Sequence, residues 1–140
     1  MEEIILKGHK VAKGKVKGEA LVTRQAISFY HGVDPATGMV TEKNHEIEGT
    51  SVAGKILVFP RVKGSSAGSY QLYEMVRCKT APKGLINLYA DPVIAVGAII
   101  SDIPMVDKLN RDPIDLIKTG DHIELDADNE IVKVNRKSKK

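Results

Sequence analysis

The strongest constraint on the fold is an apolar run that leads through a glycine- and serine-rich stretch into a helical pattern. Residues 55–60 read Lys-Ile-Leu-Val-Phe-Pro, a continuous run typical of a strand buried on both faces. Residues 64–70 then read Gly-Ser-Ser-Ala-Gly-Ser-Tyr. The order strand, glycine-rich turn and helix brings free backbone N–H groups and the positive end of a helix dipole to one place. A carboxylate or phosphate could bind there, and a plain turn capped by a serine is the alternative.

The helix is predicted over Tyr70–Cys78, with a core face formed by Leu72, Met75, Val76 and Lys79. Before it, residues 7–22 alternate apolar and basic residues, which predicts a twisted strand pair whose lysines at positions 13, 15 and 17 face water. Residues 32–50 carry turn signals and few apolar positions, as in a long loop of functional or mobile character.

After the helix, the pattern returns to short strands. Residues 84–90 read as a buried strand, and Asp91-Pro92 starts a short helix that Gly97 is expected to close, with residues 98–101 as the next strand. Asp112-Pro113 starts a turn of helix ending near Gly120, and residues 122–125 and 131–134 form a hairpin. About seven strands, one main helix and two short helices predict a mostly β, α+β fold with a barrel-like sheet.

Length and composition predict one domain. The chain has 140 residues, of which 42% are hydrophobic and 28% charged, as in globular proteins. The domain is expected over residues 1–134, followed by a basic tail, residues 135–140, that is disordered or else contacts nucleic acid. The acidic N-terminus does not resemble a signal peptide, and the longest apolar run, residues 93–100, is too short to span a bilayer. A cytoplasmic location is expected.

Metal-binding patterns are missing from the sequence. The single cysteine, Cys78, allows no intrachain disulfide and cannot hold an iron–sulfur cluster alone. Its position in the helix predicts a small buried residue. The four histidines form no close pair, so no metal is expected in this chain.

A series of short motifs, taken in order, carries a family resemblance. They lie at residues 19–22 (EALV), 27–29 (ISF), 32–38 (GVDPATG), 52–60 (VAGKILVFP), 64–69 (GSSAGS), 81–82 (AP) and 97–100 (GAII). Together they resemble the small subunits of aconitase X-type dehydratases, and within them the archaeal branch that dehydrates mevalonate 5-phosphate in isoprenoid synthesis. The resemblance covers residues 8–134 and implies the swivelling β/β/α fold.

The resemblance also implies a site and a partner. Ser65 matches the first serine of the aconitase-type Gly-Ser-Ser loop and is the expected catalytic base, with Ser66 and then Ser69 as alternatives. The residues expected to bind substrate are Lys63, Gly64, Ser66, Ser69 and Asp34. The partner would be a large subunit holding an iron–sulfur cluster, and this chain would act only together with it on a phosphorylated hydroxy acid, without nucleic acid or membrane.

Several positions depart from the family pattern. Ala67 stands where aconitases place an arginine that clamps the substrate carboxylate, so that clamp must come from Lys63 or the large subunit. Asp34 lines the pocket, docks on the large subunit, or only caps its own turn. Two other functions stay open: a related dehydratase acting on another hydroxy acid, such as a hydroxyproline, and a non-catalytic binding domain.

Overall fold

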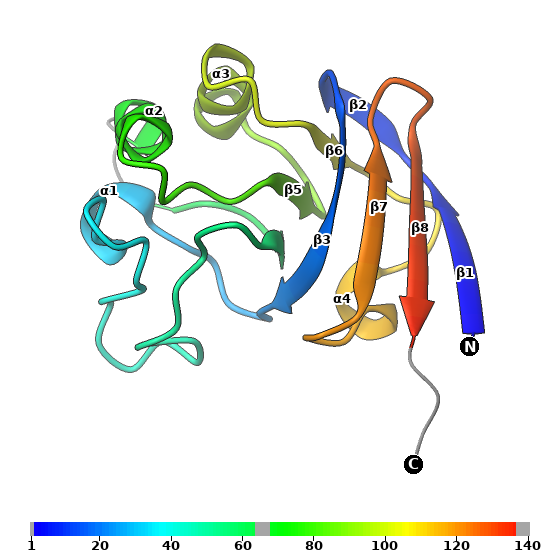
Figure 1. Ribbon diagram of the computed structural model, residues 1–140, viewed down its shortest axis with the longest axis horizontal. Helices are drawn as coiled ribbons and strands as arrows, with labels where there is room; N and C mark the ends of the chain where they lie inside the picture. Colours follow the sequence, from blue (N-terminus) through cyan, green and yellow to red (C-terminus); the bar gives the residue numbers. More distant parts are fainter. Residues whose placement is uncertain (1, 64–67, 137–140) are drawn as a thin grey trace.

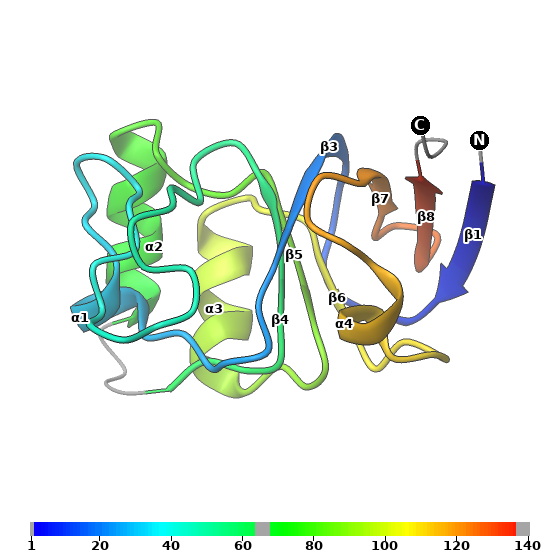
Figure 2. The ribbon, with the colours of Figure 1, turned by 90° about the horizontal axis from the view of Figure 1, so that it is seen from below.

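The computed structural model describes residues 2–63 and 68–136, which form three layers (Figures 1 and 2). The described strands are β1 (Glu2–Lys7), β2 (His9–Ala12), β3 (Lys15–Val22), β4 (Ile56–Phe59), β5 (Gly84–Asn87), β6 (Met105–Asp107), β7 (His122–Asp126) and β8 (Ile131–Arg136). The described helices are α1 (Phe29–Gly32), α2 (Gly68–Arg77), α3 (Pro92–Ile100) and α4 (Pro113–Leu116).

The strands form one mixed sheet in the order β1-β8-β7-β3-β4-β5-β6-β2. On one side of β3 the neighbours are antiparallel, whereas β3, β4, β5 and β6 run parallel. The sheet folds at β3, so its antiparallel half covers one face of its parallel half, while α1, α2 and α3 lie on the other face (Figure 2). The predicted β/β/α arrangement is confirmed, although α3 is nearly as long as α2 and the helical layer therefore has two main helices.

The central strand β4 explains the uninterrupted apolar run. Leu57 and Phe59 belong to the core beneath the helices, whereas Ile56 and Val58 belong to the core between the two halves of the sheet. All four side chains are fully buried. Because both faces of the strand are covered, alternation with polar residues is not required.

The N-terminal strand pair was predicted wrongly. β2 and β3 do form, but β2 pairs with β6 and β3 pairs with β4 and β7. β2 lies at one edge of the sheet, whereas β3 lies in its interior between β7 and β4. The lysines at positions 13, 15 and 17 are exposed, as predicted.

Helix α3 also differs from expectation. Asp91 is its N-cap, with its carboxylate accepting the Ile94 N–H at 3.0 Å, and Pro92 begins it as predicted. However, Gly97 does not end the helix, and the next strand is β6 rather than residues 98–101. A Cβ at Gly97 would lie 3.3 Å from both the Ser69 Cα and the Leu72 Cδ2, so this glycine allows α3 to pack closely against α2.

Helix α2 buries a narrower face than expected. Leu72 and Met75 are fully buried, but Val76 and Lys79 are exposed. Cys78 is exposed as well, which corrects the expectation of a buried thiol. The helix ends at Arg77 and Lys79 adopts a left-handed conformation, so the exposed residues 76–79 form the last turn of the helix and the start of the turn that follows it.

The other elements follow the sequence signals. Residues 33–54 form a long connection of turns and isolated bridges. Gly38 has φ +77°, and a Cβ there would lie 2.7 Å from the Thr80 carbonyl, so the predicted sharp turn requires glycine. α4 follows Asp112 but ends at Leu116, and the β7–β8 hairpin is confirmed. β8 continues to Arg136, so the first two residues of the expected tail belong to the sheet.

Candidate functional site

The candidate site lies at the edge of the sheet where the parallel strands end. The loops that follow neighbouring strands are joined there by backbone hydrogen bonds, from the Leu88 N–H to the Pro60 carbonyl and from the Lys108 N–H to the Leu88 carbonyl, each 3.2 Å long. Arg61, Lys63 and Lys108 are exposed along this edge. In sheets of parallel strands, ligands commonly bind beyond the carboxyl ends of the strands. The exposed cations favour an anionic ligand.

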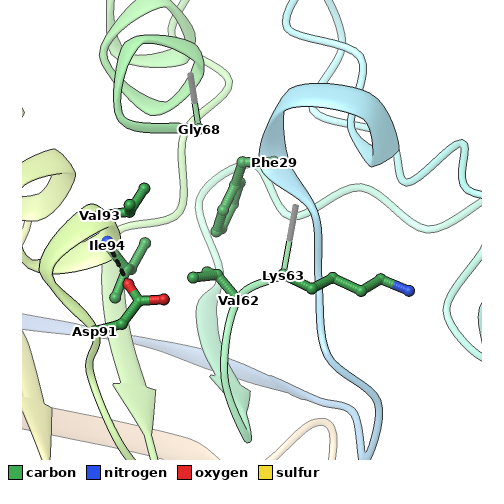
Figure 3. A pocket seen from close by; sticks show the side chains of 7 residues that line it. All are labelled: Phe29, Val62, Lys63, Gly68, Asp91, Val93 and Ile94. Atoms are coloured by element: carbon green, nitrogen blue, oxygen red, sulfur yellow. Dashed lines mark hydrogen bonds between the residues drawn. The ribbon is translucent and has the colours of Figure 1, made fainter. Parts of the chain in front are cut away.

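A narrow crevice opens in this edge between the start of α2 and the start of α3 (Figure 3). Its volume is about 30 Å³, and it is lined by Phe29, Val62, Lys63, Gly68, Asp91, Val93 and Ile94. This space holds about one water molecule. The described residues therefore form one wall of a site rather than an enclosed pocket for an organic acid.

The two helix starts are tied together beside the crevice. The Ser69 hydroxyl donates to the Val93 carbonyl at 2.8 Å, and Gly97 lets the two helices approach at this level. Ser69 is the second residue of α2, so it holds the helix against α3 instead of capping it. The bond fixes the start of α2 relative to α3.

Lys63 lies at the same edge, but its side chain points away from the crevice (Figure 3). Its backbone N–H donates to the Ile27 carbonyl at 2.9 Å, and its Nζ donates to the Glu42 Oε2 at 2.6 Å. A second cavity, of about 240 Å³, lies on this side and is lined by Lys63, Glu42, Ser28, His31 and Gly32. Lys63 thus borders both hollows, and its charge is paired.

Glu46 holds the chain where it leaves β3. Its Oε2 accepts the Thr23 hydroxyl at 2.6 Å and the Arg24 N–H at 2.5 Å. The pKa of Glu46 lies below its ordinary value of 4.5, mainly because the Thr23 hydroxyl donates to the carboxylate, and secondarily because the Arg24 N–H does. The ionised form is therefore the one that stabilises this loop.

We expect Glu46→Gln to lower the free energy of unfolding at pH 7 by about 1 kcal/mol, since hydrogen bonds to charged groups are worth somewhat more but this carboxylate is exposed to solvent. Because the pKa of the folded state is lowered, the stabilisation is complete above pH 4.5 and is lost as the pH falls through the folded-state value. Urea unfolding of both proteins from pH 7 to pH 3 measures this. A difference that stayed constant across that range would contradict the assignment.

Not all the residues predicted for the site can be placed. Gly64, Ser65 and Ser66 lie outside the described residues. Lys63 and Ser69 do lie at the crevice edge or directly beside it.

Asp34 lines neither cavity; its Oδ1 accepts the Ala36 N–H at 2.9 Å and so closes its own turn. Its loop runs along α2, where the Gln71 Nε2 donates to the Val33 carbonyl and the Thr80 hydroxyl donates to the Pro35 carbonyl.

The described ranges contain no group of three or more His, Cys, Asp or Glu side chains arranged to hold a metal. They also contain no helix that is long and apolar enough to cross a membrane.

Comparison with known proteins gives close relatives. The family model for the aconitase X swivel domain matches residues 5–134. The phosphomevalonate dehydratase small subunit of Methanocella arvoryzae is 47% identical over 130 residues, which are 93% of this chain and 98% of the relative. That of Thermococcus kodakarensis is 49% identical over 129 residues, 92% of this chain and 95% of the relative. The crystal structure of Thermococcus kodakaraensis aconitase X in its holo-form matches with a TM-score of 0.90 at 47% identity, covering 95% of this chain and 99% of that one.

Proposed function

The chain belongs to the aconitase X swivel domain family, and on this basis we propose that it is the small subunit of a phosphomevalonate dehydratase. The observation that carries the proposal is 47% identity to a protein of that name over nearly the full length of both chains. The enzyme would remove water from mevalonate 5-phosphate and give trans-anhydromevalonate 5-phosphate. Its proposed location is the cytoplasm.

The proposed partner is the large subunit that the relatives' name implies. It would hold an iron–sulfur cluster, which supplies a Lewis acid for the departing hydroxyl group. The small volume of the crevice supports this division of labour, because a wall with room for one water molecule needs a second surface to enclose the substrate.

Within this chain, Ser65 is the proposed base. It would take the proton from the carbon next to the substrate carboxylate, and the electron pair of that C–H bond would form the double bond as the C–O bond to the β-hydroxyl breaks. A serine is a weak base unless its alkoxide is stabilised, and positive charge or hydrogen-bond donors lower its pKa. Residues 64–67 join Lys63 to the start of α2, so both a lysine and a helix start are neighbours in the chain.

Among the other residues, Lys63 is the proposed contact for an anionic group of the substrate, together with Gly64 and Ser66. Ser69 would act through the bond that ties α2 to α3. Asp34 is proposed only as part of a docking surface, because its side chain lines neither cavity and its loop lies along α2.

Reconstitution tests the function. We expect the purified chain alone to give no anhydromevalonate 5-phosphate, and the chain co-expressed anaerobically with its large subunit to give it. Product is measured by ³¹P NMR, and a hydroxyproline is assayed in parallel. Turnover of hydroxyproline but not of mevalonate 5-phosphate would move the chain to the related dehydratases. Full activity of the large subunit without this chain would instead show that this chain is a non-catalytic domain.

A further inference from the structure

We infer that Glu42 is a positioning residue for Lys63, so that an ion pair at the second cavity, and not a free lysine, contacts the anionic substrate. The inference rests on the proposed function, because it assigns a role in binding that substrate. Glu42 lies in the long connection between α1 and β4, 21 residues from Lys63 in the chain.

Lys63 would be poorly ordered by itself. Its backbone is fixed by the hydrogen bond to Ile27 and by the bridge between Ile27 and Val62. Its side chain, however, is 48% exposed, and a lysine has a flexible four-carbon stem. The hydrogen bond of 2.6 Å to Glu42 is the interaction that selects one position for the Nζ.

Glu42 is itself held in place. Its side chain is 27% exposed, and its Oε1 is buried without a hydrogen-bond partner in the described residues. A Cβ added at Gly32 would lie 3.3 Å from the Glu42 Cβ and 3.1 Å from Oε1. The carboxylate therefore packs against the backbone of Gly32, which limits the positions that it can take beside Lys63.

Charge distinguishes a positioning role of Glu42 from a purely structural one. The pair is neutral as a whole, whereas mevalonate 5-phosphate carries a carboxylate and a phosphate. Lys63 attracts these groups, and Glu42 repels them. With Lys63 present, the positioning of its Nζ by Glu42 is expected to outweigh this repulsion, whereas without Lys63 the repulsion alone is left. The effect of Glu42 on substrate binding must therefore change sign when Lys63 is removed. A residue that only stabilised the fold would not show this reversal.

The test is a cycle of four proteins: wild type, Glu42→Gln, Lys63→Met and the double variant, each assembled with the large subunit. We expect Glu42→Gln to raise KM roughly fivefold with little change in kcat, since a neutral amide holds the lysine less firmly. Lys63→Met should raise KM about 30-fold or more, because it leaves a bare carboxylate facing the substrate. Adding Glu42→Gln to Lys63→Met should then lower KM again, by about threefold.

The matched control is the ion pair between Lys55 and Glu19, in which the Lys55 Nζ lies 2.5 Å from the Glu19 Oε1. Lys55 precedes β4, whereas Lys63 follows it, so this pair lies at the opposite end of the strand. Glu19→Gln should leave KM and kcat unchanged. If Glu42→Gln raises KM by the same factor with and without Lys63, Glu42 does not act through Lys63 and the inference is wrong.

A second measurement keeps this result separate from the proposed function. In the complete chain labelled with ¹³C-lysine, the Lys63 Cε resonances are assigned from Lys63→Arg. Relaxation of these resonances should show that Glu42→Gln increases the mobility of Lys63 but not of Lys55. If the wild-type complex fails to dehydrate mevalonate 5-phosphate, the proposed function is rejected. The relaxation measurement still tests whether Glu42 positions Lys63. If Lys63 is equally mobile in both proteins, the positioning role is excluded.

Discussion

Ser65→Ala is expected to lower kcat of the assembled dehydratase by about a hundredfold or more while leaving KM nearly unchanged, because a general base acts mainly in the transition state. The change removes one hydroxyl group, so the variant should still assemble with the large subunit. Any loss of stability should stay near 1 kcal/mol, the usual worth of a serine that caps a helix or turn. Steady-state kinetics and size-exclusion chromatography of the complex measure both effects.

The neighbouring serines provide the controls. Ser66→Ala removes the adjacent hydroxyl and should retain most of kcat. Ser69→Ala removes the donor to the Val93 carbonyl and should cost about 1 kcal/mol of stability with near-normal kcat. A dead Ser66→Ala beside an active Ser65→Ala would show that the base is assigned one residue too early. Three active variants would exclude serine catalysis in this loop.

The strand and the helix on either side of the glycine- and serine-rich stretch could be predicted because their signals are local. The run at residues 56–59 is apolar at every position, and residues 64–69 and Tyr70–Cys78 carry turn and helix patterns. The structure adds the reason for the run, since alternate side chains enter two different cores. Which side chains of β4 enter which core depends on the layer that covers each face of the strand. The sequence of the strand would be equally apolar in either arrangement.

Other elements depend on contacts that are distant in the chain. Gly97 was predicted to end the helix, yet it lies inside α3, where Ser69 and Leu72 of α2 pack against it. β2 and β3 were predicted to pair with each other, but β2 pairs with β6 and β3 pairs with β7. In both cases the local pattern was satisfied by more than one arrangement, and tertiary packing selected the one that forms.

The same difference between local signals and distant contacts applies to the candidate site. Lys63 was found because it precedes the glycine- and serine-rich stretch, whereas Glu42 gave no signal of its own. It lies in a long polar connection, in which Glu46 and Glu48 look equivalent to it. Only the packing of Glu42 against Gly32 and its bond to Lys63 separate it from these neighbours. An alignment showing paired changes at positions 42 and 63 would have been the sequence signal for this contact.

The second large effect is expected in the core beneath the site. Phe59 is the last residue of β4, is fully buried, and meets Phe29 edge to face with ring centroids 6.3 Å apart. Phe29 in turn lines the crevice. Removing a buried phenylalanine side chain leaves a cavity and typically costs 3–5 kcal/mol. Phe59→Ala should therefore lose about that much of a total stability that is on the order of 5–15 kcal/mol.

Urea unfolding of Phe59→Ala measures the loss, with Tyr73→Ala as the control. Tyr73 is 45% exposed on α2, and truncating it should change the free energy of unfolding by no more than about 0.5 kcal/mol. Phe59→Leu keeps much of the volume and should cost less than Phe59→Ala, because part of the cavity stays filled. If Phe59→Ala cost less than 1 kcal/mol, neighbouring side chains in the core under Phe29 would have to fill the space that the Phe59 ring occupies. The wall of the crevice would then depend on the loops and not on β4.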